Sequence, residues 1–296
     1  MCIRDSSAAA ALGLPSGLPV VIGASDGVLA GLGIGVVRPG QLSATIGTSG
    51  AVRMLADRPL VDAKQRTWCY HLVDGAWVVG GAINNGGITL RWMRDEICGY
   101  GAEASRRFGV DAYDLMTLQA ARVAPGSDGL IFLPFFSGER APHWNAEARA
   151  SFFGLSLSHT RAHLIRAAME GVCYSMHSIF AALQDVAGAA EEIRVSGSFT
   201  KSPLWLQMLA DVFGRTIHVP GVQEGAAFGA AVLGFLSTGE IDGIERTAEI
   251  VKTVATYRPQ PQHVAVYRRL FAIYEALYQA LEPQFRQIAA YQDRRS

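Results

Sequence analysis

Residues 192–236 read EIRVSGSFTKSPLWLQMLADVFGRTIHVPGVQEGAAFGAAVLGFL, and their hydrophobic pattern decides the fold class. Short apolar runs at 192–195 and 216–219 predict strands, because turn residues follow each of them. The longer segments 203–213 and 225–236 predict helices. Strands that alternate with helices along the chain are typical of an α/β fold, in which helices cover a sheet.

The same signals extend toward both ends of the chain. We expect a buried strand that ends at a glycine turn, and then four more strands: 18–23, 41–46, 51–55, 67–73 and 76–79. Asp74-Gly75 joins the last two, and Asp-Gly between apolar runs indicates a hairpin. A short strand is expected at 130–133, before a polar loop at 137–151. Helices are expected at 88–97, 114–123, 161–186 and 264–288.

The composition describes a globular protein without a strong electrostatic preference. The 296 residues are 50% hydrophobic and 18% charged, which allows a large core and is unlike a disordered chain. Lysine plus arginine number 26, as do aspartate plus glutamate. A net charge of zero provides no excess of positive charge that would attract nucleic acid or an anionic membrane. No apolar run approaches the ~20 residues that span a bilayer. We therefore expect a cytoplasmic protein whose partner is a small molecule.

The cysteines give no sign of a disulfide framework or a metal site. Cys2, Cys69, Cys98 and Cys173 form neither a CxxC pair nor a cluster with histidine. Free thiols in a reducing cytoplasm explain this spacing best. We therefore assign no metal-binding residue.

Three glycine-rich turns follow strand-like runs, at 46–50, 80–87 and 196–198. Glycine lets backbone N–H groups approach a phosphate closely, and a helix N-terminus adds a favourable field. None of the turns is a P-loop, because the sequence GxxxxGK[ST] is absent from the chain. A single such turn is most simply a turn, but three in one α/β domain make phosphate binding as good an explanation as three structural turns.

Asp26 is the carboxylate whose position is most suggestive of catalysis. It follows the expected strand 18–23, in Gly23-Ala24-Ser25-Asp26-Gly27. Ligands of α/β domains bind at strand ends. A carboxylate there can accept the proton of a hydroxyl that attacks a phosphoryl group. The alternative is a turn aspartate that caps the next helix.

Two glutamates have structural explanations, and one polar loop stays open. Glu170 lies in the apolar helix 161–186, where a hydrogen bond or salt bridge explains it best. Glu224 precedes the helix 225–236, where its charge complements the helix dipole. Arg140, His143 and Trp144 lie in the loop 137–151, which can either contact a ligand or pack on its own aromatic side chain.

Four segments, in order along the chain, resemble motifs of the FGGY carbohydrate kinases. They are Gly129-Leu-Ile-Phe-Leu-Pro134 with Ser137-Gly-Glu-Arg-Ala-Pro-His-Trp-Asn145, Ala150-Ser-Phe-Phe-Gly-Leu155 with His163-Leu-Ile-Arg-Ala-Ala-Met-Glu170, Val195-Ser-Gly-Ser-Phe-Thr-Lys-Ser-Pro-Leu-Trp205, and Glu224-Gly-Ala-Ala-Phe-Gly-Ala-Ala231. The resemblance covers 18–288. Within the family, the sequences Ala-Pro-His-Trp-Asn and Met-Glu-Gly-Val are most similar to those of gluconokinases, with xylulokinases next.

The resemblance implies a fold and a set of roles. The fold is the ribonuclease-H-like, actin-like ATPase domain, a mixed sheet flanked by helices. Asp26 matches the catalytic base that deprotonates the sugar hydroxyl, and the cofactors are ATP and Mg²⁺. The residues that match nucleotide contacts are Thr48, Gly87, Gly197, Ser198 and Ser202. Relatives commonly have a second glycine where Ser198 stands, which puts a close backbone approach there in doubt.

The resemblance also predicts how the chain is organised. Residues 1–17 read as a non-native or residual segment, 18–35 as the end of the FGGY N-terminal domain carrying Asp26, and 36–296 as the C-terminal ATP-binding domain. The family's first hairpin, with Asp-x-Gly-Thr/Ser for phosphate and Mg²⁺, has no counterpart here. We therefore expect an N-terminally truncated kinase that has little or no activity by itself.

Three functions follow from these observations. The first is phosphorylation of a sugar or sugar acid, with gluconate converted to 6-phosphogluconate and xylulose as the alternative substrate. The second is a nucleotide-binding module without catalysis. The third is an actin-like polymer subunit, against which the Ser-Gly-Glu-Arg loop argues. Formation of homo-oligomers stays open.

Overall fold

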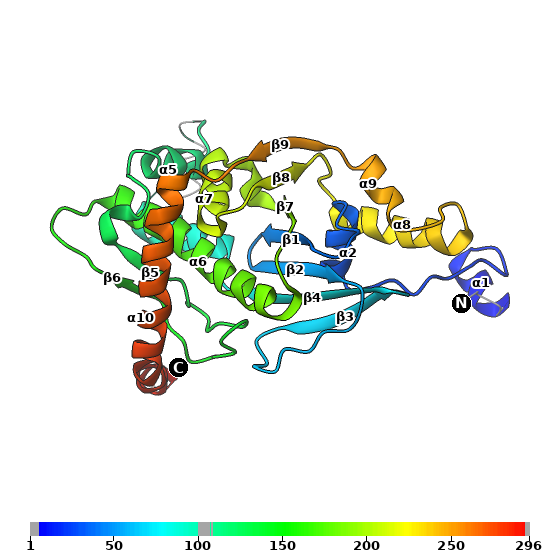
Figure 1. Ribbon diagram of the computed structural model, residues 1–296, viewed down its shortest axis with the longest axis horizontal. Helices are drawn as coiled ribbons and strands as arrows, with labels where there is room; N and C mark the ends of the chain where they lie inside the picture. The colour runs from blue at the N-terminus through cyan, green and yellow to red at the C-terminus, as the bar shows by residue number, and fades with distance from the viewer. Residues whose placement is uncertain (1–5, 100–106, 108, 294–296) are drawn as a thin grey trace.

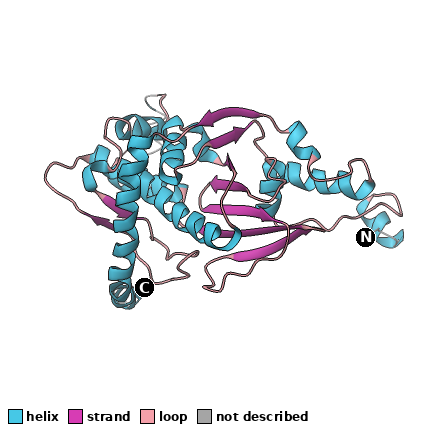
Figure 2. Ribbon diagram, in the orientation of Figure 1, coloured by secondary structure: helices cyan, strands magenta, loops and turns pink. Residues whose placement is uncertain are grey.

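The computed structural model describes residues 6–99, 107 and 109–293, and its centre is a seven-stranded sheet (Figures 1 and 2). The strand order is β3-β4-β2-β1-β7-β8-β9. The strands are β1 (Gln41–Ile46), β2 (Gly50–Ala56), β3 (Trp68–Val73), β4 (Ala76–Ile83), β7 (Glu192–Ser196), β8 (Ile217–Pro220) and β9 (Thr253–Tyr257). β1 pairs antiparallel with β2 and parallel with β7, so the sheet is mixed, as predicted. β5 (Ile131–Leu133) and β6 (Ser151–Phe153) form a separate antiparallel pair.

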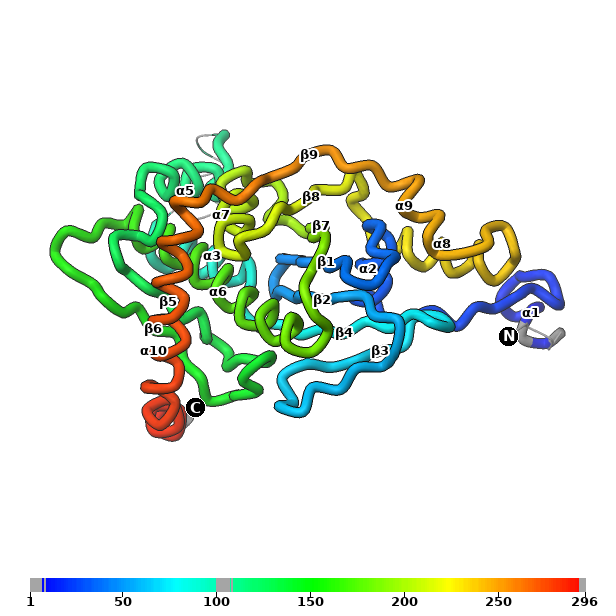
Figure 3. Tube along the Cα trace, in the orientation of Figure 1, coloured from blue at the N-terminus to red at the C-terminus, as the bar shows by residue number. Residues whose placement is uncertain are grey.

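Helices lie on both faces of the sheet. They are α1 (Ser6–Leu12), α2 (Asp26–Gly33), α3 (Gly87–Trp92), α5 (Ala112–Ala120), α6 (Arg161–Ala187), α7 (Pro203–Phe213), α8 (Gly225–Thr238), α9 (Arg246–Ile250) and α10 (Pro261–Asp293). A π-helical turn at Met93–Ile97 continues α3, and 3₁₀ turns occur at Ser127–Gly129 and Ser198–Lys201. α1 and α10 lie at opposite ends of the molecule (Figure 3).

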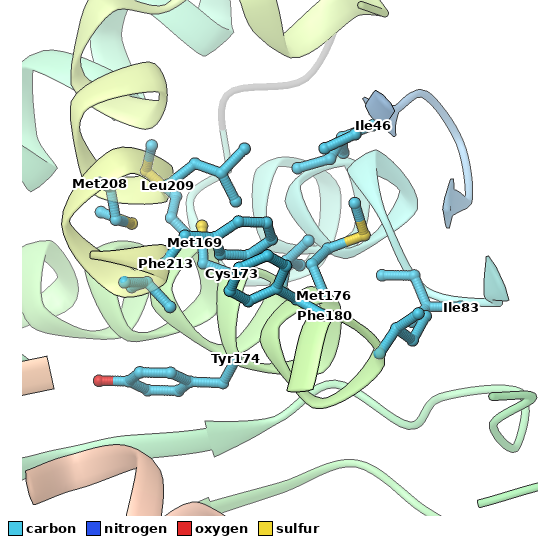
Figure 4. Packing of buried hydrophobic residues seen from close by; sticks show 14 of the residues in the cluster. Ile46, Ile83, Met169, Cys173, Tyr174, Met176, Phe180, Met208, Leu209 and Phe213 are labelled. Atoms are coloured by element: carbon cyan, nitrogen blue, oxygen red, sulfur yellow. The ribbon is translucent and has the colours of Figure 1, made fainter. Parts of the chain in front are cut away.

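The larger core fills the face of the sheet that α6 and α7 cover. Figure 4 shows Met169, Cys173 and Phe180 of α6 against Phe213 of α7, with Ile83 of the sheet nearby. Met169, Cys173 and Ile83 are fully buried. Close packing of this kind of apolar surface is the main favourable contribution to folding.

The opposite face of the sheet packs against α2. Leu55 and Val78 point to this side, since they belong to the same buried apolar cluster as Val28 and Leu32 of α2. α2 in turn packs on α8 through glycines: a Cβ at Gly229 would overlap the Leu29 backbone. The small residues of 225–236 therefore allow two helices to approach closely.

Local signals explain where the central helices begin and end. Thr160 and His163 form a capping box at the start of α6. Ser202 accepts a hydrogen bond from the Trp205 N–H at the start of α7, and Gly214 ends that helix in the left-handed region. The predicted helices 161–186, 203–213, 225–236 and 264–288 are confirmed, with ends that differ by a few residues where they differ at all.

Two predictions about the strands are wrong. The segment 18–23 is no strand, and its apolar Val20, Val21 and Ile22 are exposed, because no described segment covers them. Gly80 and Gly81 lie inside β4 instead of opening a turn. Packing explains the glycine at position 81, because a Cβ there would collide with Ala141 and Ile179. Of the unpredicted elements, β9 has mostly exposed residues and so lacks an apolar signal.

Candidate functional site

Three glycine-rich turns meet at one edge of the sheet. β1, β4 and β7 run in the same direction, because β1 is parallel to β7 and both β1 and β4 are antiparallel to β2. The turns that follow them are therefore neighbours. The backbone N–H of Gly86 donates to the Thr48 carbonyl (3.1 Å), and that of Gly87 donates to the Gly47 carbonyl (2.7 Å). Gly197 has a φ of 103°, and a Cβ there would overlap the Ile46 carbonyl.

These turns line a pocket of about 340 Å³, which we call the turn pocket. The structure brings four of the five residues predicted to bind nucleotide into its lining: Thr48, Gly87, Ser198 and Ser202. Gly197, the fifth, directly precedes Ser198 and packs on the end of β1. Sequence reasoning missed the other polar residues of the lining, which come from separate segments: Arg91, Asp111, Tyr113, Asp114, Thr117 and Lys201.

Serine is compatible with the position where relatives commonly have glycine. Ser198 opens the 3₁₀ turn Ser198–Lys201, and it is not among the described non-glycine residues with positive φ. The backbone strain that would require glycine is therefore absent at this described residue. The side chain of Ser202 lines the pocket and also caps α7, so it has a structural role in addition.

Asp26 lies in a second cavity of about 480 Å³, which we call the Asp26 cleft. It is the first residue of α2 and is exposed, and its Oδ1 accepts a hydrogen bond from the Gly27 N–H (2.6 Å). Ser25, not Asp26, occupies the N-cap position. The side chains of Trp68, Tyr70 and His71 form an aromatic wall of this cleft. Asp26 therefore faces open space that a ligand of sugar size can enter.

Two arginines line the Asp26 cleft. The guanidinium of Arg53 lies against the backbone of Gly27, with Nη2 2.5 Å from the position that a Cβ would take. Arg140 donates from Nη2 to the Ile83 carbonyl (2.9 Å). Burial lowers the pKa of Arg53, while Asp26 raises it and Arg140 lowers it further. Arg53 thus experiences both the carboxylate and the second arginine.

Glu139, which directly precedes Arg140, is buried. Its Oε1 accepts hydrogen bonds from the backbone N–H groups of Asn84 (2.6 Å) and Arg140 (2.8 Å). Burial raises its pKa to about 7, although these hydrogen bonds oppose the shift. Of the residues predicted in this loop, Arg140 lines the Asp26 cleft, whereas His143 lies outside that cleft and stacks on Tyr278 of α10. Trp144 is exposed.

The end of β4 connects the turn pocket with the Asp26 cleft. Ala82 of β4 lines the Asp26 cleft, and Gly87, a few residues later, lines the turn pocket. In the part of the chain that the structure describes, no group of three or more His, Cys, Asp or Glu side chains is placed to hold a metal ion. No helix of the described residues is long and apolar enough to cross a membrane.

Comparison with known proteins assigns the chain to a family. The C-terminal domain of the FGGY family of carbohydrate kinases matches residues 42–238. The chain belongs to this family. FGGY relatives include the gluconokinases of Bacillus licheniformis (44% identical over 285 residues) and Bacillus subtilis (45% over 282 residues). A xylulose kinase of Staphylococcus epidermidis is 30% identical over 275 residues.

Solved FGGY structures agree with the fold. A gluconate kinase from Lactobacillus acidophilus superposes with a TM-score of 0.87 at 29% identity, and a xylulose kinase from Rhodospirillum rubrum with 0.84 at 34%. The match covers 96% of this chain in the first case and 95% in the second. The predicted actin-like α/β fold is thereby confirmed. The chain spans 56% and 55% of the two Bacillus gluconokinases, about half the length of these relatives.

Proposed function

We propose that this chain carries the nucleotide pocket and the catalytic base of a kinase that transfers the terminal phosphoryl group of ATP to a hydroxyl of gluconate. One observation carries the proposal: four predicted nucleotide contacts line the turn pocket, and Asp26 lines the cleft beside it. The relatives at 44% and 45% identity, both named gluconokinase, support the substrate. Xylulose is the second candidate, because xylulose kinases are also among the relatives.

The turn pocket fits a nucleoside triphosphate. Gly87 and Gly197 bring backbone close to the cavity without side chains, and Thr48 and Ser198 add hydroxyl donors. Arg91 and Lys201 add positive charge, which phosphates require. Mg²⁺ would enter with the phosphate oxygens, because this ion is usually bound through one or two carboxylates and the substrate phosphates.

In the proposed reaction, Asp26 accepts the proton of the substrate hydroxyl as that oxygen attacks the phosphoryl group. Its carboxylate is exposed to the cleft, so a bound hydroxyl can reach it. A positioned base contributes about 10²–10⁴-fold to the rate. Most of the remaining acceleration in phosphoryl transfer comes from positioning and from neutralisation of charge.

Calorimetric titration of ATP–Mg²⁺ into the chain tests the nucleotide half. We expect binding, and we expect Lys201→Met to weaken it by about 5-fold, because an exposed charge contributes roughly 1 kcal/mol. Lys252→Met is the matched control, since Lys252 is an exposed lysine that lines neither the turn pocket nor the Asp26 cleft. Equal affinities of the two variants would remove the turn pocket from the proposal.

The kinase half is tested on the gene product that contains this chain. We expect gluconate-dependent formation of ADP, which Asp26→Asn reduces by about 10²–10⁴-fold while the affinity for ATP is retained. Xylulose is assayed in parallel. A wild-type protein that binds ATP but phosphorylates neither compound would refute the proposed substrate.

A further inference from the structure

We propose that Arg53 and Arg140 form a carboxylate-binding site in the Asp26 cleft, and that this site selects sugar acids over neutral sugars. The inference rests on the proposed function, in which the cleft holds the substrate. It adds the residues that determine specificity.

Arg53 presents buried donors without acceptors. It lies within β2 on the face of the sheet that α2 covers, where its neighbours along the strand are apolar. Its Nε and Nη1 are buried, and no described residue accepts a hydrogen bond from either. Buried polar groups in folded proteins are nearly always paired, so each exception requires an explanation. A ligand in the cleft that Arg53 lines provides one.

Arg140, which also lines the cleft, shows the same deficit. Its Nη2 is fixed by the Ile83 carbonyl, but its buried Nε has no acceptor among residues 6–99, 107 and 109–293. Glu139 fixes the backbone of Arg140 by accepting its N–H. The guanidinium is therefore held in place, while part of its hydrogen-bonding capacity stays unused.

The charges of the cleft favour a ligand with one negative charge. Two guanidinium groups and the Asp26 carboxylate line it, and the pKa of Arg53 responds to both other charges. One further anion would leave the group neutral. A guanidinium binds a carboxylate through two parallel hydrogen bonds, which a hydroxyl cannot reproduce. A sugar acid supplies such a carboxylate, and a neutral sugar does not.

The transferred phosphoryl group is the competing anion. It would come from the turn pocket, whose lining includes neither Arg53 nor Arg140. Arg53 pairs with Gly80 in the middle of the sheet, whereas the turns that form the pocket follow the strand ends. The position of Arg53 therefore favours the substrate carboxylate over the phosphoryl group.

A pair of substrates that differ only in the charged group tests the inference. Gluconate and glucitol share their carbon chain, but glucitol has a hydroxymethyl group in place of the carboxylate. In the gene product that contains this chain, we expect Arg53→Gln to lower kcat/KM for gluconate by about 10–100-fold, mainly through KM. For glucitol we expect a change of less than about 3-fold, because the removed charge contacts no part of it. Arg140→Gln should act in the same direction.

Controls separate the possible failures. Arg58→Gln changes an exposed arginine outside the cleft and should leave both substrates unaffected. Thermal unfolding shows whether each variant folds. If Arg53→Gln does not fold, Arg53→Lys replaces it, because lysine retains the charge but cannot form the two parallel hydrogen bonds. Equal losses for both substrates would assign the arginines to the phosphoryl group and overturn the inference. A wild-type protein that phosphorylates gluconate and glucitol equally well would also overturn it, with the kinase proposal intact. A wild-type protein that phosphorylates neither would refute the proposed function itself.

Discussion

Arg166 and Arg53 are two arginines in largely buried surroundings, and their hydrogen bonds differ completely. Arg166 of α6 donates to Glu170 (2.8 Å), to the Val123 carbonyl (2.9 Å) and to the Tyr267 hydroxyl (2.9 Å). Arg53 has two buried nitrogen atoms without an acceptor in the described chain. The protein satisfies one guanidinium, whereas the described chain leaves part of the other without a hydrogen-bond partner.

The difference separates a structural charge from a functional one. Glu170, which pairs with Arg166, also accepts from the Gly126 N–H and the Ser127 hydroxyl, so the carboxylate is satisfied as well. This confirms the structural interpretation of Glu170. Burial alone therefore does not distinguish the two regions, because charged side chains are buried in both. The regions differ in whether the buried donors of the arginine have acceptors in the described chain.

The comparison predicts its largest effect at Arg166. Arg166→Met leaves the buried carboxylate of Glu170 without its cation and removes donors from three other oxygens. Loss of one partner of a buried ion pair costs about 3–5 kcal/mol. We expect the free energy of unfolding, measured with urea, to fall by this amount. A loss below about 1 kcal/mol, similar to that of the exposed control Arg58→Met, would contradict the structural role of Arg166.

A second test concerns the pH dependence that Glu139 causes. Its pKa is about 7 in the folded protein against an ordinary value of 4.5, so the folded state binds the extra proton between these pH values. The contribution of Glu139 to stability is therefore largest below pH 4.5 and is lost as the pH rises to about 7. The lost free energy is on the order of 3 kcal/mol.

The difference between wild type and Glu139→Gln isolates this contribution. Glutamine retains the oxygen that accepts from Asn84 and Arg140. His143 and His177, whose pKa values burial lowers to about 4, give the opposite slope in both proteins and cancel in the difference. Urea unfolding from pH 5 to pH 8 should therefore show wild type losing stability relative to the variant. Parallel curves would show that Glu139 stays ionised.

Sequence patterns predicted the parts of the fold that local chemistry determines. α7 has the predicted bounds 203–213, because Ser202 and Pro203 begin the helix and Gly214 ends it. The prediction of a buried strand at 18–23 is wrong, because an apolar run is buried only where another segment covers it. The prediction of a turn at Gly80 and Gly81 is also wrong. Glycine stands inside the strand there because the side chains of Trp68 and Ile179 pack against these two positions.

The candidate site divides in the same way. Part of the turn pocket is lined by turns that follow strands, and glycine marks such turns in a sequence, so Thr48, Gly87 and Ser198 could be predicted. The rest of its lining comes from helices and loops without such a signal. The Asp26 cleft depends on side chains that the fold brings together from α2, β2, β3 and the loop containing Arg140. A signal for Arg53 existed, since it is the single charge in the apolar strand Gly50–Ala56. The identity of its neighbours required the structure.

Two glycines with similar backbone conformations test whether the turn at Gly197 shapes a nucleotide-binding pocket. Gly188 has φ 86° and ψ −171°, and Gly197 has φ 103° and ψ 174°. Alanine at either position should cost about 1–3 kcal/mol of unfolding free energy through backbone strain. A Cβ meets nothing at Gly188 but overlaps the Ile46 carbonyl at Gly197. We therefore expect only Gly197→Ala to weaken ATP binding in calorimetry. Equal affinities would show that this turn does not shape the pocket.

The smallest change in the free energy of unfolding is expected for Arg53→Met, which directly tests the difference between Arg53 and Arg166. Arg53→Met replaces a guanidinium whose Nε and Nη1 make no hydrogen bond to the described chain by an apolar side chain of similar length. It also removes repulsion from Arg140, at the expense of attraction to Asp26. Replacing buried charges by apolar groups is often neutral or stabilising. We expect the free energy of unfolding to change by less than about 1 kcal/mol, while the preference for gluconate is lost. Residues retained for a ligand commonly show this opposition between stability and function. If Arg53→Met instead destabilised the fold as much as Arg166→Met, the two arginines would belong to one structural class, and unused hydrogen-bonding capacity would no longer identify the site.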